Sequence, residues 1–234
     1  MPLWSFAIFC TFTIFSICVL FYHFVLEDSS SGATSKSQSN GISIVIDAGH
    51  GGDDPGKVGV NNALEKDINL AIALELKAML ENKGFTVYLT REDDSALSSK
   101  KEDMKARMDM IKEIQPAFIV SIHQNSYTDA SVCGPQVFYY SESPEGKEFA
   151  QIMQQEINNF LTPAKPRVSQ ANNNYYLLKE SPAPIIIVEC GFLSNPEEAD
   201  LLTTTTYQQK IARGIYFGIM SYYEGSSSES EPST

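Results

Sequence analysis

Residues that can bind a metal ion or move a proton follow several apolar runs of the sequence. His50 lies in the glycine-rich loop DAGHGGDDPG, and His123 and Glu189 come directly after the runs AFIVSI and IIIV. Glu65 stands at the start of the helix expected after that loop. Catalytic zinc sites use three nitrogen, oxygen or sulfur ligands from the protein and keep a fourth position for water. These residues are therefore compatible with a zinc hydrolase, although their spacing does not match the His-Glu-x-x-His motif.

Glu189 is the residue whose surroundings most favour a functional role. A carboxylate directly after four apolar residues is costly to bury unless it is paired, hydrogen-bonded or close to a metal. We interpret it as the acid–base group that takes a proton from water and passes it to the departing amine. Each of the other three residues has a structural alternative: a flexible glycine turn for His50, a hydrogen-bonded core histidine for His123, and favourable charge at a helix N-terminus for Glu65.

The elements that must position these residues alternate along the chain. Short apolar runs predict strands, and amphipathic or charged stretches predict helices between them. The expected strands cover 42–46, 85–89, 117–122, 136–140 and 185–188, and the expected helices cover 67–82, 98–114, 146–161, 196–202 and 207–223. This alternation is typical of an α/β fold with a mostly parallel sheet between helices. Because the carboxyl ends of parallel strands share one edge, the candidate site residues should converge there.

The two ends of the chain differ in composition from the part between them. Residues 1–27 contain an uncharged apolar run from Leu3 to Leu26, which is long enough to cross a bilayer of about 30 Å. We expect a signal anchor that places the domain outside the cytoplasm, with a cleaved signal peptide as the alternative. Residues 28–40 are expected to form a flexible linker, 41–223 the catalytic domain, and 224–234 a disordered tail.

Charge and cysteine content restrict the function further. The formal net charge of −12 repels phosphate backbones, so nucleic-acid binding is excluded, whereas a carbohydrate or peptide substrate stays open. Cys133 and Cys190 are expected to be separate, largely buried thiols, although a disulfide is the alternative. Cys190 as a nucleophile, with His50 or His123 as its base, is a second enzymatic hypothesis.

Five segments taken together resemble the zinc-dependent N-acetylmuramoyl-L-alanine amidases of the type 3 family. They are IVIDAGHGGDDPG, LEKDINLAIAL, VYLTR, FIVSIHQNS and IIIVECGFLSNPEEADLL. The resemblance implies a six-stranded mixed sheet between helices. It also implies one zinc ion (Zn2+) bound by His50, Glu65 and His123, with Glu189 as the catalytic glutamate. The implied reaction is hydrolysis of the amide bond between N-acetylmuramic acid and L-alanine in peptidoglycan.

The short, anchored architecture is similar to the spore-cortex branch of this family, which acts in sporulation and germination. That similarity implies removal of stem peptides before muramic-δ-lactam forms, outside the cytoplasm and in the space between the forespore and mother-cell membranes. Since the sequence contains no wall-binding repeat, we also expect an activating or targeting protein partner. Two rival functions remain: a zinc peptidase acting on the stem peptide, and a wall-binding domain without catalysis.

The sequence departs from the family pattern at two positions near the candidate site. Ala48 replaces a usual proline, and Gln124 replaces a commonly small residue. Gln124, Asn125 and Arg107 are candidate substrate contacts, and Gln124 is expected to affect substrate fit or metal retention. The alternative for Arg107 is a solvated helix face.

Overall fold

The computed structural model describes residues 41–95 and 99–229, and from 226 to 229 only the helical backbone. The expected anchor at 1–27 and the expected linker at 28–40 therefore lie outside the described residues. Within the described ranges, no helix combines the length and the apolar character needed to cross a membrane.

Six strands form one sheet in the order β2-β1-β3-β6-β4-β5. Strands β2, β1, β3 and β6 run parallel, β4 runs antiparallel to β6, and β5 is parallel to β4. The mixed six-stranded sheet expected from the sequence is confirmed. The strands are β1 (Ser43–Ala48), β2 (Thr86–Leu89), β3 (Phe118–Asn125), β4 (Gln136–Tyr139), β5 (Gln170–Ala171) and β6 (Ile185–Phe192).

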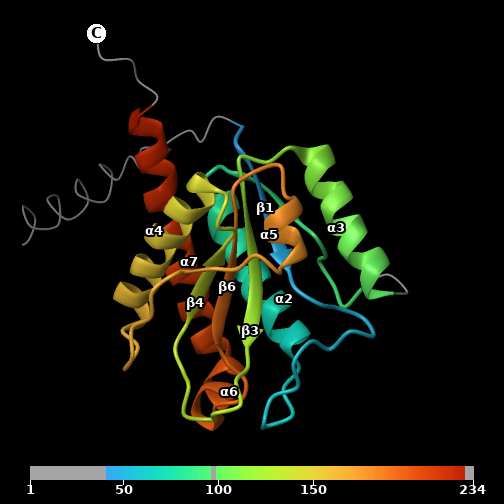
Figure 1. The fold of residues 1–234 in the computed structure, drawn as a ribbon, viewed down its shortest axis with the longest axis vertical. Helices are drawn as coiled ribbons and strands as arrows, with labels where there is room; N and C mark the ends of the chain where they lie inside the picture. Colours follow the sequence, from blue (N-terminus) through green and yellow to red (C-terminus); the bar gives the residue numbers. More distant parts are fainter. Residues whose placement is uncertain (1–40, 96–98, 230–234) are drawn as a thin grey trace, which may run out of the picture. The chain divides into compact units, whose positions relative to one another are not determined.

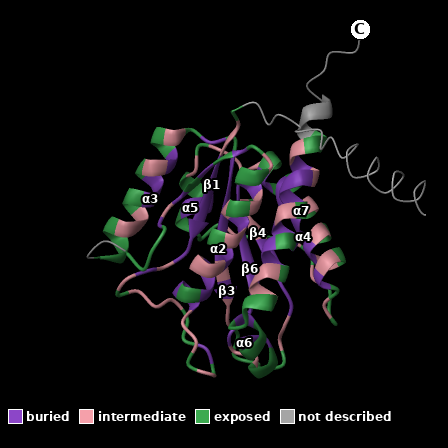
Figure 2. Ribbon diagram, turned by 180° about the vertical axis from the view of Figure 1, so that it is seen from behind, coloured by how far each residue is buried: buried purple, intermediate pink, exposed green. Residues whose placement is uncertain are grey.

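Helices cover both faces of this sheet, as Figures 1 and 2 show from opposite sides. Helices α2, α4 and α7 pack on one face, and α3 and α5 pack on the other, while α6 follows β6. The helices are α2 (Glu65–Asn82), α3 (Lys100–Ile114), α4 (Pro144–Leu161), α5 (Tyr176–Glu180), α6 (Pro196–Leu202) and α7 (Thr205–Glu229). This arrangement buries the central strands on both faces, which explains their continuous apolar sequences.

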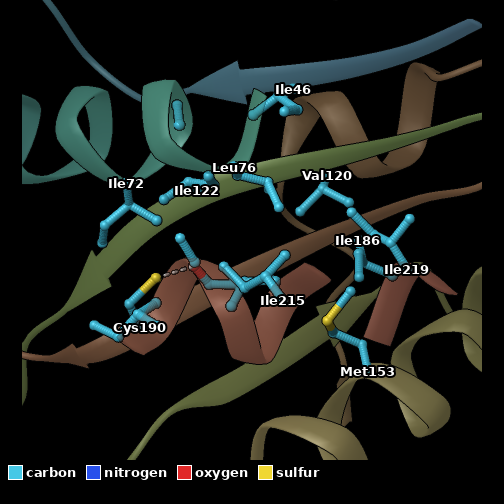
Figure 3. Close-up of a cluster of buried hydrophobic side chains, with 14 of the residues drawn as sticks. Ile46, Ile72, Leu76, Val120, Ile122, Met153, Ile186, Cys190, Ile215 and Ile219 are labelled. Atoms are coloured by element: carbon cyan, nitrogen blue, oxygen red, sulfur yellow. Dashed lines mark hydrogen bonds between the residues drawn. The ribbon is translucent and has the colours of Figure 1, made fainter. Parts of the chain in front are cut away.

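The core divides according to the alternation of side chains along the strands. Ile46 and Val120 point toward the α2, α4 and α7 face, where Figure 3 shows them with Leu76 and Ile219. Val45 points the opposite way, into the smaller cluster beneath α3 and α5. Each fully buried side chain of this size contributes about 1.5–3 kcal/mol relative to exposure. Two separate hydrophobic clusters therefore stabilise the sheet, one on each face.

Strands β3 and β6 extend further than the apolar runs predicted. His123 and Glu189 lie within the strands and face each other in register, followed by a shift in the ladder before Asn125. The extension arises because β3 and β6 continue to pair with each other after their apolar runs end, at His123 with Glu189 and at Asn125 with Phe192. Helix α7 likewise continues to Glu229, past the expected domain boundary, and residues 230–234 lie outside the described residues.

Candidate functional site

The three side chains predicted to hold zinc meet at the carboxyl edge of the parallel strands. His50, Glu65 and His123 each offer one ligand atom, and these three atoms lie within 4.8 Å of one another. Glu65 Oε1 lies 3.3 Å from His50 Nε2 and 2.9 Å from His123 Nδ1. Two imidazole nitrogens and a carboxylate oxygen form a donor set that suits Zn²⁺. The geometry therefore allows these residues to hold a metal ion.

Two glycines allow the ligand side chains to approach so closely. A Cβ atom on Gly49 would lie 2.2 Å from His123 Cε1, too close to the imidazole ring for any side chain to fit. Gly56 has a φ of +66°, and a Cβ there would lie 2.6 Å from both Glu65 Oε2 and His50 Cδ2. His50 itself has a φ of 63°, a left-handed conformation that residues other than glycine rarely adopt. The loop after β1 is thus shaped around the three ligands rather than being a flexible turn.

Glu65 is fixed by hydrogen bonds from surrounding backbone groups. The amides of Lys57 and Gln124 donate to its carboxylate at 2.7 and 3.0 Å, and Asn69 Nδ2 lies 3.4 Å from Oε1. Burial alone would raise the pKa of Glu65, but hydrogen bonds and charge from both histidines hold that pKa well below its usual range. Glu65 is therefore an anion in a fixed orientation, as a metal ligand requires.

Asp54 holds the imidazole of His50 from its other side. His50 Nδ1 lies 2.8 Å from Asp54 Oδ2, and since a carboxylate only accepts, Nδ1 carries the proton. This leaves Nε2, the nitrogen facing Glu65, as the ligand atom. Carboxylates in this position orient many metal-binding histidines. Asp54 was not predicted as a site residue, although its place four residues after His50 in the same loop was a usable signal.

The electrostatics of the site favour a positive charge near His123. Burial lowers the pKa of this imidazole, but the hydrogen bond to Glu65 and the charges of Glu65, Glu189 and Asp47 raise it above its ordinary value overall. A site that stabilises a proton on a buried imidazole also attracts a cation. The charge distribution therefore agrees with the donor set.

Glu189 faces the same cavity from β6. Its side chain is 6% exposed, and within the described part of the chain its Oε2 atom has no hydrogen-bond partner. Burial raises the pKa of Glu189 to about 7, and Glu65 adds to this, while His123, His50 and a hydrogen bond from Tyr175 act in the opposite direction. A carboxylate with a pKa near neutrality can both accept and return a proton at physiological pH.

A cavity of about 420 Å³ opens over these residues between α3 and the segment around α5. Its lining includes the ligand residues, Glu189, and Tyr175 and Tyr176. Tyr175 packs edge-on against Phe138, with ring centroids 5.9 Å apart. Burial together with the charges of Glu189 and Glu65 raises the pKa of Tyr175 to about 12, so its hydroxyl stays protonated and can donate. Tyr175 was missed in the sequence because α5 is too short to show a helical pattern.

The three candidate substrate contacts lie in different surroundings. Asn125, Gln124 and Arg107 all line the cavity, but Gln124 is buried and its Nε2 donates to Asn69 Oδ1 at 3.1 Å. Arg107 is only 4% exposed, so the alternative of a solvated helix face is wrong. Its position, three residues after Met104 and four before Ile111, indicated an inward direction on α3. Its guanidinium binds the loop that carries His50, and a substrate contact by Arg107 stays a prediction.

The hypothesis of a Cys190 nucleophile is wrong. Cys190 is fully buried in the core on the α2 and α7 side of the sheet, as Figure 3 shows, whereas the cavity lies elsewhere. Burial raises the pKa of its thiol far above the ordinary range, and Glu189 adds to the effect. Such a thiol is inert. Cys133 and Cys190 are both free, and Cys133 is half-buried.

The sequence matches the profile of the family described as N-acetylmuramoyl-L-alanine amidase over residues 44–221. The chain belongs to this family. It is therefore an N-acetylmuramoyl-L-alanine amidase, as the five sequence segments predicted, and the enzymes of this family are generally zinc-dependent. The match includes every residue of the candidate site.

Relatives of the amidase agree with this assignment over nearly their whole length. It is 33% identical over 218 residues to the germination-specific N-acetylmuramoyl-L-alanine amidase of Bacillus subtilis, covering 89% of this chain and 91% of that protein. The fold is similar to the structure of the CwlD amidase from Clostridioides difficile in complex with the GerS lipoprotein, with a TM-score of 0.76. The two sequences are 39% identical, and the match covers 79% of this chain and 99% of the other. An N-acetylmuramoyl-L-alanine amidase from Clostridium difficile 630 is 34% identical with a TM-score of 0.73, covering 80% and 98% of the two chains.

Proposed function

We propose that this amidase uses zinc held by His50, Glu65 and His123 to cleave the bond between N-acetylmuramic acid and L-alanine in spore-cortex peptidoglycan. The observation that carries the proposal is the meeting of three ligand atoms within 4.8 Å, beside a buried carboxylate with an unpartnered oxygen. A zinc ion bound there supplies Lewis-acid polarisation of a carbonyl and lowers the pKa of water to about 7.

The side chains of the amidase then divide the remaining work. Glu189 Oε2 accepts a proton from the water that adds to the lactyl carbonyl carbon. As the bond from carbon to nitrogen breaks, the same oxygen gives that proton to the nitrogen of L-alanine, so the products are a free lactyl carboxyl group and a free amine. Asp54 keeps the imidazole of His50 in one orientation, and the hydroxyl of Tyr175 favours the ionised form of Glu189 and so lowers its pKa.

A role in the cortex is supported by the relatives rather than by the site. The Bacillus subtilis relative is named as germination-specific, and the match extends over most of both chains. We infer that the amidase removes stem peptides during sporulation and so permits formation of muramic-δ-lactam, which germination requires. Peptidoglycan lies outside the cytoplasm, so the enzyme acts there.

A protein partner is part of the same proposal. The Clostridioides difficile CwlD amidase was solved in complex with the GerS lipoprotein, and it resembles this chain over 99% of its length. We propose that this amidase likewise acts with an activating or targeting protein. The apolar segment from Leu3 to Leu26 supports anchoring at the membrane, between the forespore and the mother cell, on sequence grounds alone.

Analysis of digestion products tests the reaction directly. Purified cortex peptidoglycan is incubated with the zinc-loaded enzyme, and the products are separated by mass. Intact stem peptides with a free L-alanine amine are expected, together with glycan strands whose muramic acid has lost its peptide. Shortened peptides still attached to the glycan would instead identify a zinc peptidase, and binding without any products would identify a wall-binding domain. Comparable rates on vegetative wall peptidoglycan would contradict the cortex assignment.

The roles within the site are tested by two variants and a metal measurement. His50→Ala should lose bound zinc, whereas Glu189→Ala should keep zinc and lose activity by about 10²–10⁴-fold, because only the proton transfer is removed. Metal content is measured on both purified proteins alongside the wild type. Loss of zinc in Glu189→Ala would show that the roles are misassigned.

A further inference from the structure

Two buried arginines hold the backbone of the loop that carries His50. Arg91 donates from Nε to the carbonyl of Ala48 at 3.0 Å and from Nη2 to the carbonyl of Gly49 at 3.1 Å. Arg107 donates from Nη1 to Ala48 and from Nη2 to His50, in both cases at 2.7 Å. Three consecutive carbonyls thus accept hydrogen bonds from two guanidinium groups, and neither arginine is more than 6% exposed.

This loop needs such support because its conformation is unfavourable by itself. His50 has a φ of 63°, and left-handed backbone at a residue with a side chain persists only where surrounding contacts enforce it. The carbonyls that the arginines hold belong to His50 and to the two residues before it. Their fixed direction sets the path of the chain into His50 and therefore the direction of its imidazole.

Arg91 also connects this loop to the helix that carries Glu65. Its Nη2 atom donates to the carbonyl of Lys66 at 2.7 Å, in the first turn of α2, and its Nη1 atom donates to the carbonyl of Asp93 at 2.9 Å. One guanidinium group therefore binds the backbone beside His50 and the backbone beside Glu65. This contact fixes the spacing of the two ligands.

Arg107 connects the same loop to the strand that carries His123. Its Nη1 atom lies 2.6 Å from Asp47 Oδ1, and the other oxygen of Asp47 accepts a hydrogen bond from Ser121 Oγ at 2.5 Å. Ser121 lies two residues before His123 in β3, on the same strand face. Asp103 in α3 also binds Arg107, and its Oδ2 atom accepts a hydrogen bond from Arg107 Nε at 2.7 Å.

We propose that Arg91 and Arg107 are positioning residues that bring together the metal ligands of the loop after β1, of α2 and of β3. The inference rests on the proposed zinc site. It assigns Arg107 a task inside the protein in place of the substrate contact expected from the sequence. Neither arginine touches the reacting atoms. Their effect reaches the reaction through the backbone of the His50 loop and through Asp47.

The test replaces each guanidinium group with a single ammonium group. Arg107→Lys and Arg91→Lys keep the charge but replace three separate donor nitrogens with one, which cannot reach all the groups that each guanidinium holds. Full-length wild type and variants are stripped with a chelator, and the zinc dissociation constant is measured by competition with an indicator. Removal of groups that orient metal ligands typically weakens binding by about 10–100-fold, which is the expected loss. At saturating zinc, kcat and KM should return to near the wild-type values.

The control is Lys105→Ala, which removes an exposed, ion-paired residue of the same helix α3 and should leave zinc affinity unchanged. Unchanged affinity in both arginine variants would overturn the proposal. A raised KM that excess zinc does not correct would also overturn it, in favour of a substrate contact by Arg107. Failure of both variants to fold, judged by circular dichroism, would assign the pair to general stability instead. Absence of zinc binding in the wild type would contradict the proposed function itself.

Discussion

Glu189 carries a cost for stability that is separate from its chemistry. Burial, with the charge of Glu65, raises its pKa from 4.5 to about 7, so the folded protein prefers the protonated form. Ionisation is therefore unfavourable in the folded state above the unfolded pKa, and the cost grows until the pH passes the folded pKa. A shift of this size corresponds to about 3 kcal/mol.

Glu189→Gln should consequently stabilise the zinc-free protein at pH 8 by up to about 3 kcal/mol, with a gain that fades as the pH falls toward 4.5. Urea unfolding in a chelator, repeated across this range, measures the difference. Glu148→Gln, at an exposed position of α4, is the matched control and should show no such trend. Equal stability of wild type and Glu189→Gln at pH 8 would show that burial leaves Glu189 unperturbed.

Tyr175 acts on the same carboxylate in the opposite direction. Its hydrogen bond stabilises ionised Glu189 and lowers the pKa of that group. Tyr175→Phe should therefore move the acidic limb of the kcat/KM profile to higher pH, by up to about one unit. Tyr176→Phe removes a hydroxyl from the neighbouring wall of the cavity and is the control. Identical shifts in both variants would mean that the effect does not depend on contact with Glu189.

Among the elements, the packing of α7 against α4 can be tested at two glycines of α7. A Cβ atom on Gly214 would lie 3.7 Å from Phe160 Cδ1, an ordinary contact, whereas on Gly218 it would lie 2.4 Å from Met153 Sδ and 3.2 Å from Met153 Cα. Both substitutions by alanine gain helix propensity. Gly214→Ala should stabilise by about 1 kcal/mol, and Gly218→Ala should destabilise by about 1–3 kcal/mol through crowding.

Denaturant unfolding of the two variants and the wild type measures whether the two changes in the free energy of unfolding have opposite signs. The pair controls for propensity, because each change adds one methyl group to the interior of the same helix. A gain of similar size in both would show that Met153 moves aside without cost.

The elements also show what the sequence could and could not predict. The strands and long helices followed from apolar runs and periodicity, and the convergence of His50, His123 and Glu189 followed from the rule that parallel strands end at one edge. Strand β5 and helix α5 have two and five residues, too few to show a period. Tyr175 lies at the start of α5, so its approach to Glu189 depends on tertiary packing that no local pattern contains.

The residues that orient the ligands could not be predicted from the sequence for a related reason. Asp54, Arg91 and Arg107 act through a loop whose left-handed residue, His50, has no sequence signature of its own. The spacing of Arg107 on α3 indicated an inward direction, but its partner Asp47 belongs to β1, and no local pattern connects the two residues. His50, His123 and Glu189 were therefore predictable as site residues from their places at strand ends, whereas Glu65 as a ligand was implied by the family resemblance, and Asp54 and Arg91, which orient the ligands, were not predicted.

At the scale of the whole molecule, the proposed zinc site joins segments that are distant in the sequence. Its ligands come from the loop after β1, from α2 and from β3, and the unfolded chain does not hold them together. An ion that binds only the folded protein stabilises it according to its free concentration. The gain is about 2.7 kcal/mol when that concentration is one hundred times the dissociation constant.

Zinc should therefore raise the melting temperature of the chelator-treated protein by about 5–10 °C at that concentration, given the usual relation of free energy to melting temperature for domains of this size. Calorimetry with increasing zinc measures the rise, which should continue with concentration because mass action does not saturate. His50→Ala removes one ligand and should abolish most of the effect. A rise of equal size in His50→Ala, or none in the wild type, would mean that the stabilising ion binds elsewhere or not at all, because His50 is one of the three proposed ligands.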